Sequence, residues 1–219
     1  MSTIPTGDLV GVLADVVPFA CTDEEIPALN CVQVHWDGEM LHAYSTDRYR
    51  IGISSWAPGD IEPEGEVQDD LFTNWGGGDD PWTMTVALDE ATELAKVFKL
   101  PAKERQTALT VDYDPQTYRL KVVRSRDTGH SAITIAVPST GEVFPDLRKL
   151  LADSDKVRAT RSLVYNAKYL ADFAKVRPMG PMELTFTSRM THVSIGKRFV
   201  GAIMPLEVEN KRPGADEGY

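Results

Sequence analysis

The sequence predicts an α+β protein built from three copies of one small unit, in which a helix is followed by three strands. Two observations carry this prediction. Apolar residues at helical spacing are followed, three times along the 219 residues, by short segments in which apolar and polar residues alternate. Turn-forming pairs such as Asp37-Gly38 and Asp114-Pro115 separate several of these segments. The period is loose, so the repeat is one of structure rather than of sequence.

The first unit is expected to open with a helix over 8–17, because its apolar residues form one stripe: Leu9, Leu13, Val16 and Val17. Its three strands are predicted over 28–36, 40–45 and 49–54. Together these segments make one helix-then-three-strands unit.

The second and third units each add a short strand before the helix. In the second unit this strand is predicted over 83–88, and the helix begins at Asp89 and ends near Pro101. Its later strands are predicted over 109–113, 118–124 and 132–137. In the third unit the first strand is predicted over 160–164 and the helix is capped by Asn166. Its later strands are predicted over 183–187, 191–195 and 200–203.

Composition places the chain among soluble globular proteins, with 42 % hydrophobic and 26 % charged residues. No apolar run is long enough to span a membrane, and the N-terminus lacks the pattern of a secretory signal. Cys21 and Cys31 are the only cysteines and suggest reduced thiols, so a cytoplasmic location is expected. The net charge of −10 argues against wrapping DNA with the whole surface, but it permits basic residues gathered on one face.

The residue types needed for catalysis or metal binding do not occur at useful spacing. The four histidines fall on separate predicted strands or turns, and the two cysteines form no CxxC pair. Gly76-Gly77-Gly78 lacks the Lys-Ser/Thr that follows in a phosphate-binding loop. We therefore expect a protein that is not an enzyme and that holds neither a metal nor a cofactor.

Four segments resemble the β subunit, or sliding clamp, of bacterial DNA polymerase III. Thr3-Ile4-Pro5 and residues 26–31 (IPALNC) are similar to the start of that clamp's middle domain. Residues 45–51 (STDRYRI) resemble its strand end ATDGHRL, and residues 143–151 (VFPDLRKLL) resemble its connector FPDYRRVLP. Residues 165–173 and 199–208 resemble its last half-domain, which ends in MPMRL. The four segments occur in the order of the family.

The resemblance implies an α+β DNA-clamp fold of repeated β-α-β-β-β units, amounting to about one and a half clamp domains. The match is to a middle domain followed directly by the second half of the last domain. The corresponding division is a clamp domain over 1–148 and a clamp half-domain over 149–209. Residues 57–81, rich in Gly, Pro and acid, are predicted to form an insertion loop, and 210–219 a flexible tail.

The resemblance also implies both walls of the pocket in which clamps bind peptides of polymerases. Carried over by position, the pocket residues are Leu29, Thr46, Arg48, Tyr49, Arg50, Ile51, Pro145, Lys149, Leu150, Ala202, Met204, Pro205, Leu206 and Val208. Two positions depart from the family: Arg48 replaces a glycine, and Glu207 replaces an arginine. Both changes alter the rim, so the preferred peptide can differ from that of the family.

The expected function is therefore that of a processivity factor that binds DNA polymerases or other replication and repair proteins. An alternative is a monomeric module that recruits or sequesters clamp-binding proteins without encircling DNA. Three units per chain leave an odd half-unit, so the sequence leaves ring formation and homo-oligomerisation open.

Basic residues on two predicted helices make double-stranded DNA a possible partner. They are Lys96, Lys99, Lys103, Lys168, Lys175 and Arg177. The first helix carries Asp8 and Asp15 and no basic residue. Contact with phosphates and an ordinary solvated helix face explain these residues equally well.

The insertion loop contains a possible clamp-binding motif of its own. Gln68, Leu71 and Phe72 fit the Gln-x-x-Leu-Phe pattern that β clamps recognise. The motif could dock into this protein's own pocket, a neighbour's, or that of another clamp. A coincidence in an acidic loop is an equally simple explanation.

Overall fold

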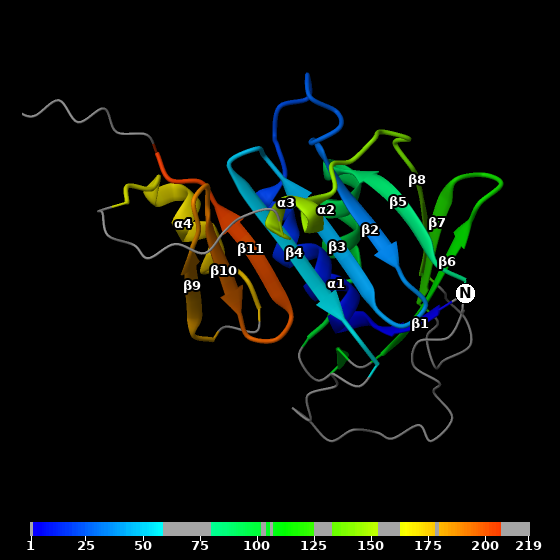
Figure 1. The fold of residues 1–219 in the computed structure, drawn as a ribbon. Coiled ribbons are helices and arrows are strands. Elements are labelled where there is room, and N and C mark those ends of the chain that lie inside the picture. The colour runs from blue at the N-terminus through cyan, green and yellow to red at the C-terminus, as the bar shows by residue number, and fades with distance from the viewer. Residues whose placement is uncertain are drawn as a thin grey trace, which may run out of the picture.

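The computed structural model describes residues 2–58, 80–101, 104–105, 107–124, 133–152, 163–177 and 180–206. Outside them lie most of the predicted insertion loop, the predicted tail and five predicted site residues: Gln68, Leu71, Phe72, Lys103 and Val208. The described residues form an α+β structure with two antiparallel sheets, as predicted (Figure 1). Among the described helices, none has the length and apolar character needed to cross a membrane.

The first unit contains the predicted helix and three strands, preceded by one further strand. Its elements are β1 (Ser2–Pro5), α1 (Thr6–Val16), the short 3-10 helix η1 (Val17–Phe19), β2 (Cys31–Trp36), β3 (Leu41–Thr46) and β4 (Arg50–Trp56). The predicted Asp37-Gly38 turn is confirmed: Asp37 Oδ1 accepts hydrogen bonds from the amides of Glu39 and Met40, and Gly38 has a φ of 103°. At four residues, β1 is too short to show alternation in the sequence.

The second unit also matches its prediction. Its elements are β5 (Trp82–Ala87), α2 (Leu88–Val97), β6 (Ala108–Asp114), β7 (Arg119–Arg124) and β8 (Ile133–Pro138). The two units exchange their first strands, since β1 pairs with β6 and β5 pairs with β2. One four-stranded sheet therefore has the order β1-β6-β7-β8. This exchange joins the two units into one domain around a shared core.

The third unit is reached through α3 (Leu147–Ala152), a helix that the sequence analysis treated as a connector. It contains α4 (Ala167–Phe173), β9 (Met182–Phe186), β10 (Thr191–Ile195) and β11 (Phe199–Ile203). The Asn166 cap is confirmed, because its side chain accepts a hydrogen bond from the amide of Lys168. Of the strand predicted over 160–164, only Leu163 and Val164 are described, and Val164 makes a single bridge to Leu206. The predicted division between 148 and 149 falls inside α3.

The third unit continues the sheet of the first. Because β4 pairs with β11, one seven-stranded sheet runs in the order β5-β2-β3-β4-β11-β10-β9. Gly52 lies opposite Gly201 in this pairing. A Cβ atom on Gly201 would lie 2.4 Å from the Ile51 carbonyl oxygen, and one on Gly52 would lie 2.8 Å from the Phe19 ring. The two glycines thus let aromatic rings pack directly on the junction, with the Phe19 and Phe173 centroids 4.8 Å apart.

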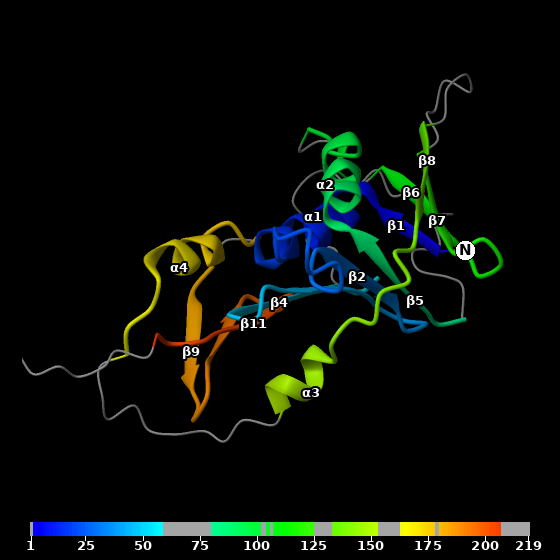
Figure 2. The same cartoon turned by 90° about the horizontal axis from the view of Figure 1, so that it is seen from above.

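The helices divide between the two faces of the seven-stranded sheet. Figure 2 shows α1, α2 and α4 on one face and α3 on the other. We call these the helix face and the outer face. The main core lies between α1, α2 and the strands, and a second, aromatic core lies under α4. Each helix buries its apolar stripe against the sheet, and each alternating strand turns its apolar side toward the helices.

Two buried polar contacts also join the half-domain to the first domain on the helix face. The Arg50 guanidinium binds the carboxylates of Asp47 and Asp172 and lies 4.2 Å from the centre of the Tyr169 ring. Asp15, near the end of α1, accepts hydrogen bonds from Ser54 Oγ (2.9 Å) and from the Arg177 amide (2.8 Å). The half-domain is therefore fixed by polar contacts as well as by strand pairing.

Candidate functional site

The β3–β4 turn has a backbone conformation that usually requires glycine. Asp47 Oδ1 accepts hydrogen bonds from the amides of Tyr49 (3.0 Å) and Arg50 (2.8 Å), which closes the turn. Arg48 then adopts a φ of +79°, in the left-handed region. This is the position at which the family motif quoted above has glycine. The strain is about 1 to 3 kcal/mol for a residue with a Cβ atom.

We expect glycine to be the more stable replacement at Arg48. Arg48→Gly and Arg48→Ala both remove the guanidinium, which lies 6.0 Å from the centre of the Tyr49 ring. Only the glycine variant also removes the left-handed strain, so its free energy of unfolding should exceed that of the alanine variant by about 1 kcal/mol. Urea denaturation of the two variants measures the difference. Equal stabilities would show that the turn stores no strain.

The outer face carries a small apolar cluster where the first domain meets the half-domain. Its buried members come from β3, β4, α3 and β11: Tyr44, Ile51, Ile53, Leu147 and Ala202. Phe144, Leu151 and Met190 pack against them. Ala202 lies opposite Ile51 in the β4–β11 pairing, so the cluster spans the junction between the first and third units.

Helix α3 covers this cluster, and its sequence explains why it forms a short helix with an N-terminal cap. Asp146 Oδ1 accepts a hydrogen bond from the Lys149 amide at 3.0 Å, which is the bonding pattern of a cap. Leu147, Leu150 and Leu151 have helical spacing. Leu147 and Leu151 pack into the cluster, whereas Leu150 remains 47 % exposed. One apolar side chain of α3 is therefore available to a ligand.

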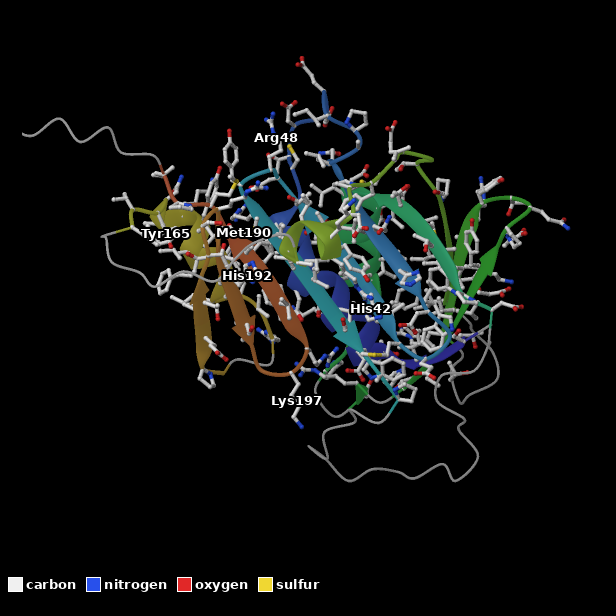
Figure 3. The ribbon with its side chains drawn as sticks, viewed as in Figure 1. His42, Arg48, Tyr165, Met190, His192 and Lys197 are labelled. Atoms are coloured by element: carbon white, nitrogen blue, oxygen red, sulfur yellow. The ribbon has the colours of Figure 1, made fainter. Side chains whose placement is uncertain are left out.

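Large apolar side chains in α3 or next to β4 and β11, the elements that carry the cluster, are exposed to solvent. They are Tyr49 (49 %), Leu150 (47 %), Met204 (43 %) and Leu206 (49 %). Met204 is held beside the turn because its amide donates to the Tyr49 carbonyl at 2.9 Å. Figure 3 shows Arg48 and Met190 at the same end of the sheet, where β4 begins and β10 begins. Exposed apolar side chains next to a buried apolar cluster are typical of a surface that binds a protein segment.

A more polar hollow of about 290 Å³ lies beside the start of α3. Its lining residues are Gln33, His35, Tyr44, Thr83, Phe144, Pro145, Asp146, Leu147 and Arg148. Tyr44 and Leu147 belong both to this hollow and to the apolar cluster. Burial raises the pKa of Tyr44 in spite of the nearby Arg148 guanidinium, so the phenol stays neutral and can donate a hydrogen bond. The hollow is therefore a polar continuation of the apolar site.

The structure brings together one set of side chains that the sequence spacing did not reveal. His42 Nε2 lies 3.0 Å from Asp37 Oδ2, and His42 Nδ1 lies 2.7 Å from Ser55 Oγ. His42 is only 4 % exposed, and burial lowers its pKa despite the Asp37 carboxylate. Neither His42 nor Ser55 lines the hollow. The three residues therefore hold β2, β3 and β4 together, and we assign them no catalytic role.

The predicted pocket residues have different surroundings in the structure. Ile51 and Ala202 are buried members of the apolar cluster, and Tyr49, Leu150, Met204 and Leu206 are exposed, with the Tyr49 ring stacked on Tyr169 at a centroid distance of 6.1 Å. Arg48 and Lys149 are exposed, Thr46 is buried under the turn, Pro145 lines the polar hollow, and Pro205 is half-buried between two of these exposed residues. The prediction did not include Tyr44, Leu147 or Met190. Leu147 and Leu151 could have been found from the helical spacing of α3.

Two further predicted pocket residues make contacts within the protein. The buried Arg50 guanidinium binds Asp172 and lies 4.2 Å from the centre of the Tyr169 ring, on which Tyr49 also stacks. Neighbouring strand residues point to opposite faces, so Arg50 lies on the helix face and Ile51 on the outer face. Leu29 lies in the turn before β2, where its amide donates to the Ile26 carbonyl and its carbonyl accepts from the Cys21 amide.

Of the predicted DNA-facing residues, those that the structure describes lie on or next to helices of the helix face. Lys96, Lys99 and Lys168 are exposed on or beside α2 and α4. Lys175 also is exposed, but its ammonium pairs with Asp172 at 2.5 Å. The acidic residues of α1 are not free surface charges: Asp15 is buried, and Asp8 pairs with Arg198 at 2.7 Å. Among the described residues, no group of histidine, cysteine or acidic side chains could hold a metal ion.

Comparison with known proteins gives one consistent result. No protein-family model matches the sequence, and no curated protein matches it either. Among solved structures, the DNA polymerase sliding clamp of Bacillus subtilis superposes with a TM-score of 0.69 at 15 % identity, over 95 % of this chain and 64 % of that one. The Pseudomonas aeruginosa sliding clamp gives 0.68 at 13 % identity, over 94 % and 66 %.

The DNA polymerase III beta subunit of Thermotoga maritima gives 0.70 at 14 % identity, over 94 % of this chain and 65 % of that one. This chain thus spans just under two thirds of the length of the clamps that it resembles. The identities are low, but nearly all of the chain superposes. The chain therefore has the fold of the bacterial DNA polymerase sliding clamps.

Proposed function

We propose that the chain is a clamp-like processivity factor that binds apolar peptides of DNA polymerases or other replication proteins at the β4–β11 junction. The observation that supports this most directly is the group of exposed side chains, Tyr49, Leu150, Met204 and Leu206, around the buried floor of Ile51 and Ala202. In this role the protein binds its partners and catalyses no reaction.

The surface fits a peptide of the Gln-x-x-Leu-Phe type. Leucine and phenylalanine side chains gain free energy by leaving water for an apolar floor. The flexible Met204 can adapt to either shape. Arg48, Arg148 and Lys149 are exposed around the site and give it a positive rim, which suits acidic residues within or beside the peptide. The basic side chains would then orient the peptide, and burial of its apolar side chains would supply most of the affinity.

We propose further that the helix face meets double-stranded DNA. Lys96, Lys99 and Lys168 are exposed on this face, on the side of the sheet opposite the peptide site. Lys175 contributes less, because Asp172 already balances its charge. With a net charge of −10, the protein would make weak contacts that salt disrupts easily.

Fluorescence anisotropy with a labelled Gln-x-x-Leu-Phe peptide tests the peptide site. Met204→Ala and Leu206→Asp should each weaken binding by about 1 to 3 kcal/mol, or roughly five- to a hundredfold. The chain offers matched controls on β9, where Met182 is 45 % and Leu184 is 40 % exposed. Met182→Ala and Leu184→Asp make the same chemical changes far from the site, so they should leave the affinity unchanged.

Two results would overturn the proposed site. The first is the absence of saturable peptide binding to the unmodified protein. The second is an equal loss of affinity in the variants on β9, which would mean that the substitutions act through general destabilisation. Binding to duplex DNA is measured separately, and Lys96→Glu with Lys168→Glu should abolish it without altering peptide affinity.

A further inference from the structure

The polar hollow beside α3 can hold part of a ligand in addition to the apolar cluster. Among the described helices, α3 alone lies on the outer face (Figure 2). The hollow of about 290 Å³ has room for several water molecules, each of which takes about 30 Å³ in the liquid. It shares Tyr44 and Leu147 with the apolar cluster, so one bound segment can contact both.

The lining of the hollow contains one acidic and one basic side chain, Asp146 and Arg148. Neither forms an ion pair with another described residue. An incoming carboxylate would therefore meet the charge of Asp146, and an incoming ammonium would meet that of Arg148. An uncharged polar group avoids both repulsions, and it also loses less hydration than an ion does.

The hollow offers hydrogen-bond donors and acceptors together. The Arg148 guanidinium lies 5.5 Å from the centre of the Tyr44 ring, a contact that holds this donor in place. His35 Nδ1 lies 3.0 Å from the Trp82 carbonyl oxygen and must donate to it, so the neutral ring presents Nε2 as an acceptor. The carboxylate of Asp146 is a second acceptor. A carboxamide, whose oxygen accepts and whose NH₂ donates, matches this combination.

The distance from the apolar floor to the hollow fits a short extended segment. Gln33 lines the hollow and lies opposite Tyr44, which in turn lies opposite Ile53. Gln33 is thus two strands across and two residues along from Ile51, roughly 12 Å away at about 4.8 Å per strand and 3.3 Å per residue. An extended peptide covers this distance in about three or four residues.

We propose that the hollow binds the carboxamide of a glutamine or asparagine about three or four residues from the apolar side chains of the same bound peptide. The inference rests on the proposed peptide site and adds a second determinant to it. The floor favours apolar residues, and the hollow selects an uncharged amide over an acidic residue. Two positions in a Gln-x-x-Leu-Phe peptide have this spacing: the glutamine of the motif, and the third residue after the phenylalanine.

Fluorescence anisotropy with two sets of labelled peptides tests the inference. In each set one of the two positions is glutamine, glutamate or alanine, and the rest of the peptide is constant. The assay is run at about pH 8, where imidazoles are ordinarily neutral. In the set whose varied residue reaches the hollow, the glutamine peptide should bind about three- to tenfold more tightly than the other two.

Asp146→Asn shows whether the preference arises in the hollow. Asparagine can keep the cap of α3, but Arg148 then leaves the hollow with a positive charge. The glutamate peptide should therefore gain affinity by about three- to tenfold in this variant, and Arg148→Gln should weaken it by a similar factor. Glu183→Gln is the matched control, since it removes one negative charge from the exposed strand β9, at the opposite edge of the sheet from β5. It should leave the preference unchanged.

The results separate this inference from the proposed peptide site. Equal affinities within both sets would overturn the inference alone. A preference that neither Asp146→Asn nor Arg148→Gln alters would do so too, and Arg148 is exposed, so its replacement should not disturb folding. The same holds for a preference that Glu183→Gln alters as much as Asp146→Asn does. A protein that binds none of the peptides would overturn the peptide site as well.

Discussion

Replacing Gly201 with alanine should destabilise the protein by about 3 kcal/mol or more, a large effect for the addition of one methyl group. The new Cβ atom would lie 2.4 Å from the carbonyl oxygen of Ile51 and 2.9 Å from the Phe199 ring. The backbone of a paired strand cannot yield as a flexible side chain can, so β4 and β11 must move apart. The free energy of unfolding from urea denaturation measures the cost.

Gly180→Ala is the matched control, because nothing lies within 4 Å of its added Cβ atom. We expect it to change stability by less than about 1 kcal/mol. Gly201→Ala should also weaken peptide binding, since Ala202 and Ile51 form the floor of the proposed site. If Gly201→Ala were as stable as Gly180→Ala, the close β4–β11 approach would not exist in solution.

Raising the pH from about 4 to about 7 should cost the protein about 2 kcal/mol of stability through Asp15 alone. Burial raises the pKa of this carboxyl from 3.8 to about 6, although hydrogen bonds from the Arg177 amide and Ser54 oppose the shift. Between these values the folded protein holds a proton that the unfolded chain has released. Stability therefore falls as the pH rises through this window, and the loss is complete above the folded-state pKa.

Asp15→Asn isolates this effect because asparagine does not titrate and can keep both hydrogen bonds. The stability of the variant relative to the unmodified protein should increase by about 2 kcal/mol between about pH 4 and pH 7. Asp37 does not interfere: burial opposes its ionisation, but hydrogen bonds from His42 and two amides hold its pKa at about 2. A pH-independent difference between the two proteins would show that Asp15 titrates normally.

The sequence predicted the long elements well because their patterns are local. Apolar spacing identified α1 and α2, and turns such as Asp37-Gly38 separated the strands correctly. The described elements that it missed, β1, η1 and α3, have four, three and six residues. Such lengths carry little periodicity, although the Asp146 cap of α3 was visible in the sequence.

The candidate site could be predicted only in part. Motif positions proposed Arg50 and Ile51 alike, but they do not indicate which face a side chain occupies: Ile51 lies in the outer-face cluster, and Arg50 binds Asp172 on the helix face. Met190 packs with Ile51 and Ala202 because β11 pairs with β4, and these two strands are far apart in the sequence. No local pattern contains that information. The left-handed conformation of Arg48 was likewise hidden, because arginine rarely adopts it.

The pairing of β4 with β11 also sets an order on synthesis and folding. The paired residues lie about 150 positions apart in the sequence, so the ribosome releases β4 long before its neighbour exists. During that interval the edge of β4 and the apolar residues Ile51 and Ile53 are open to other chains. Contacts between such distant segments form slowly. Premature termination before Phe199 should therefore yield a product that aggregates, because this sheet can close only after β11 has emerged.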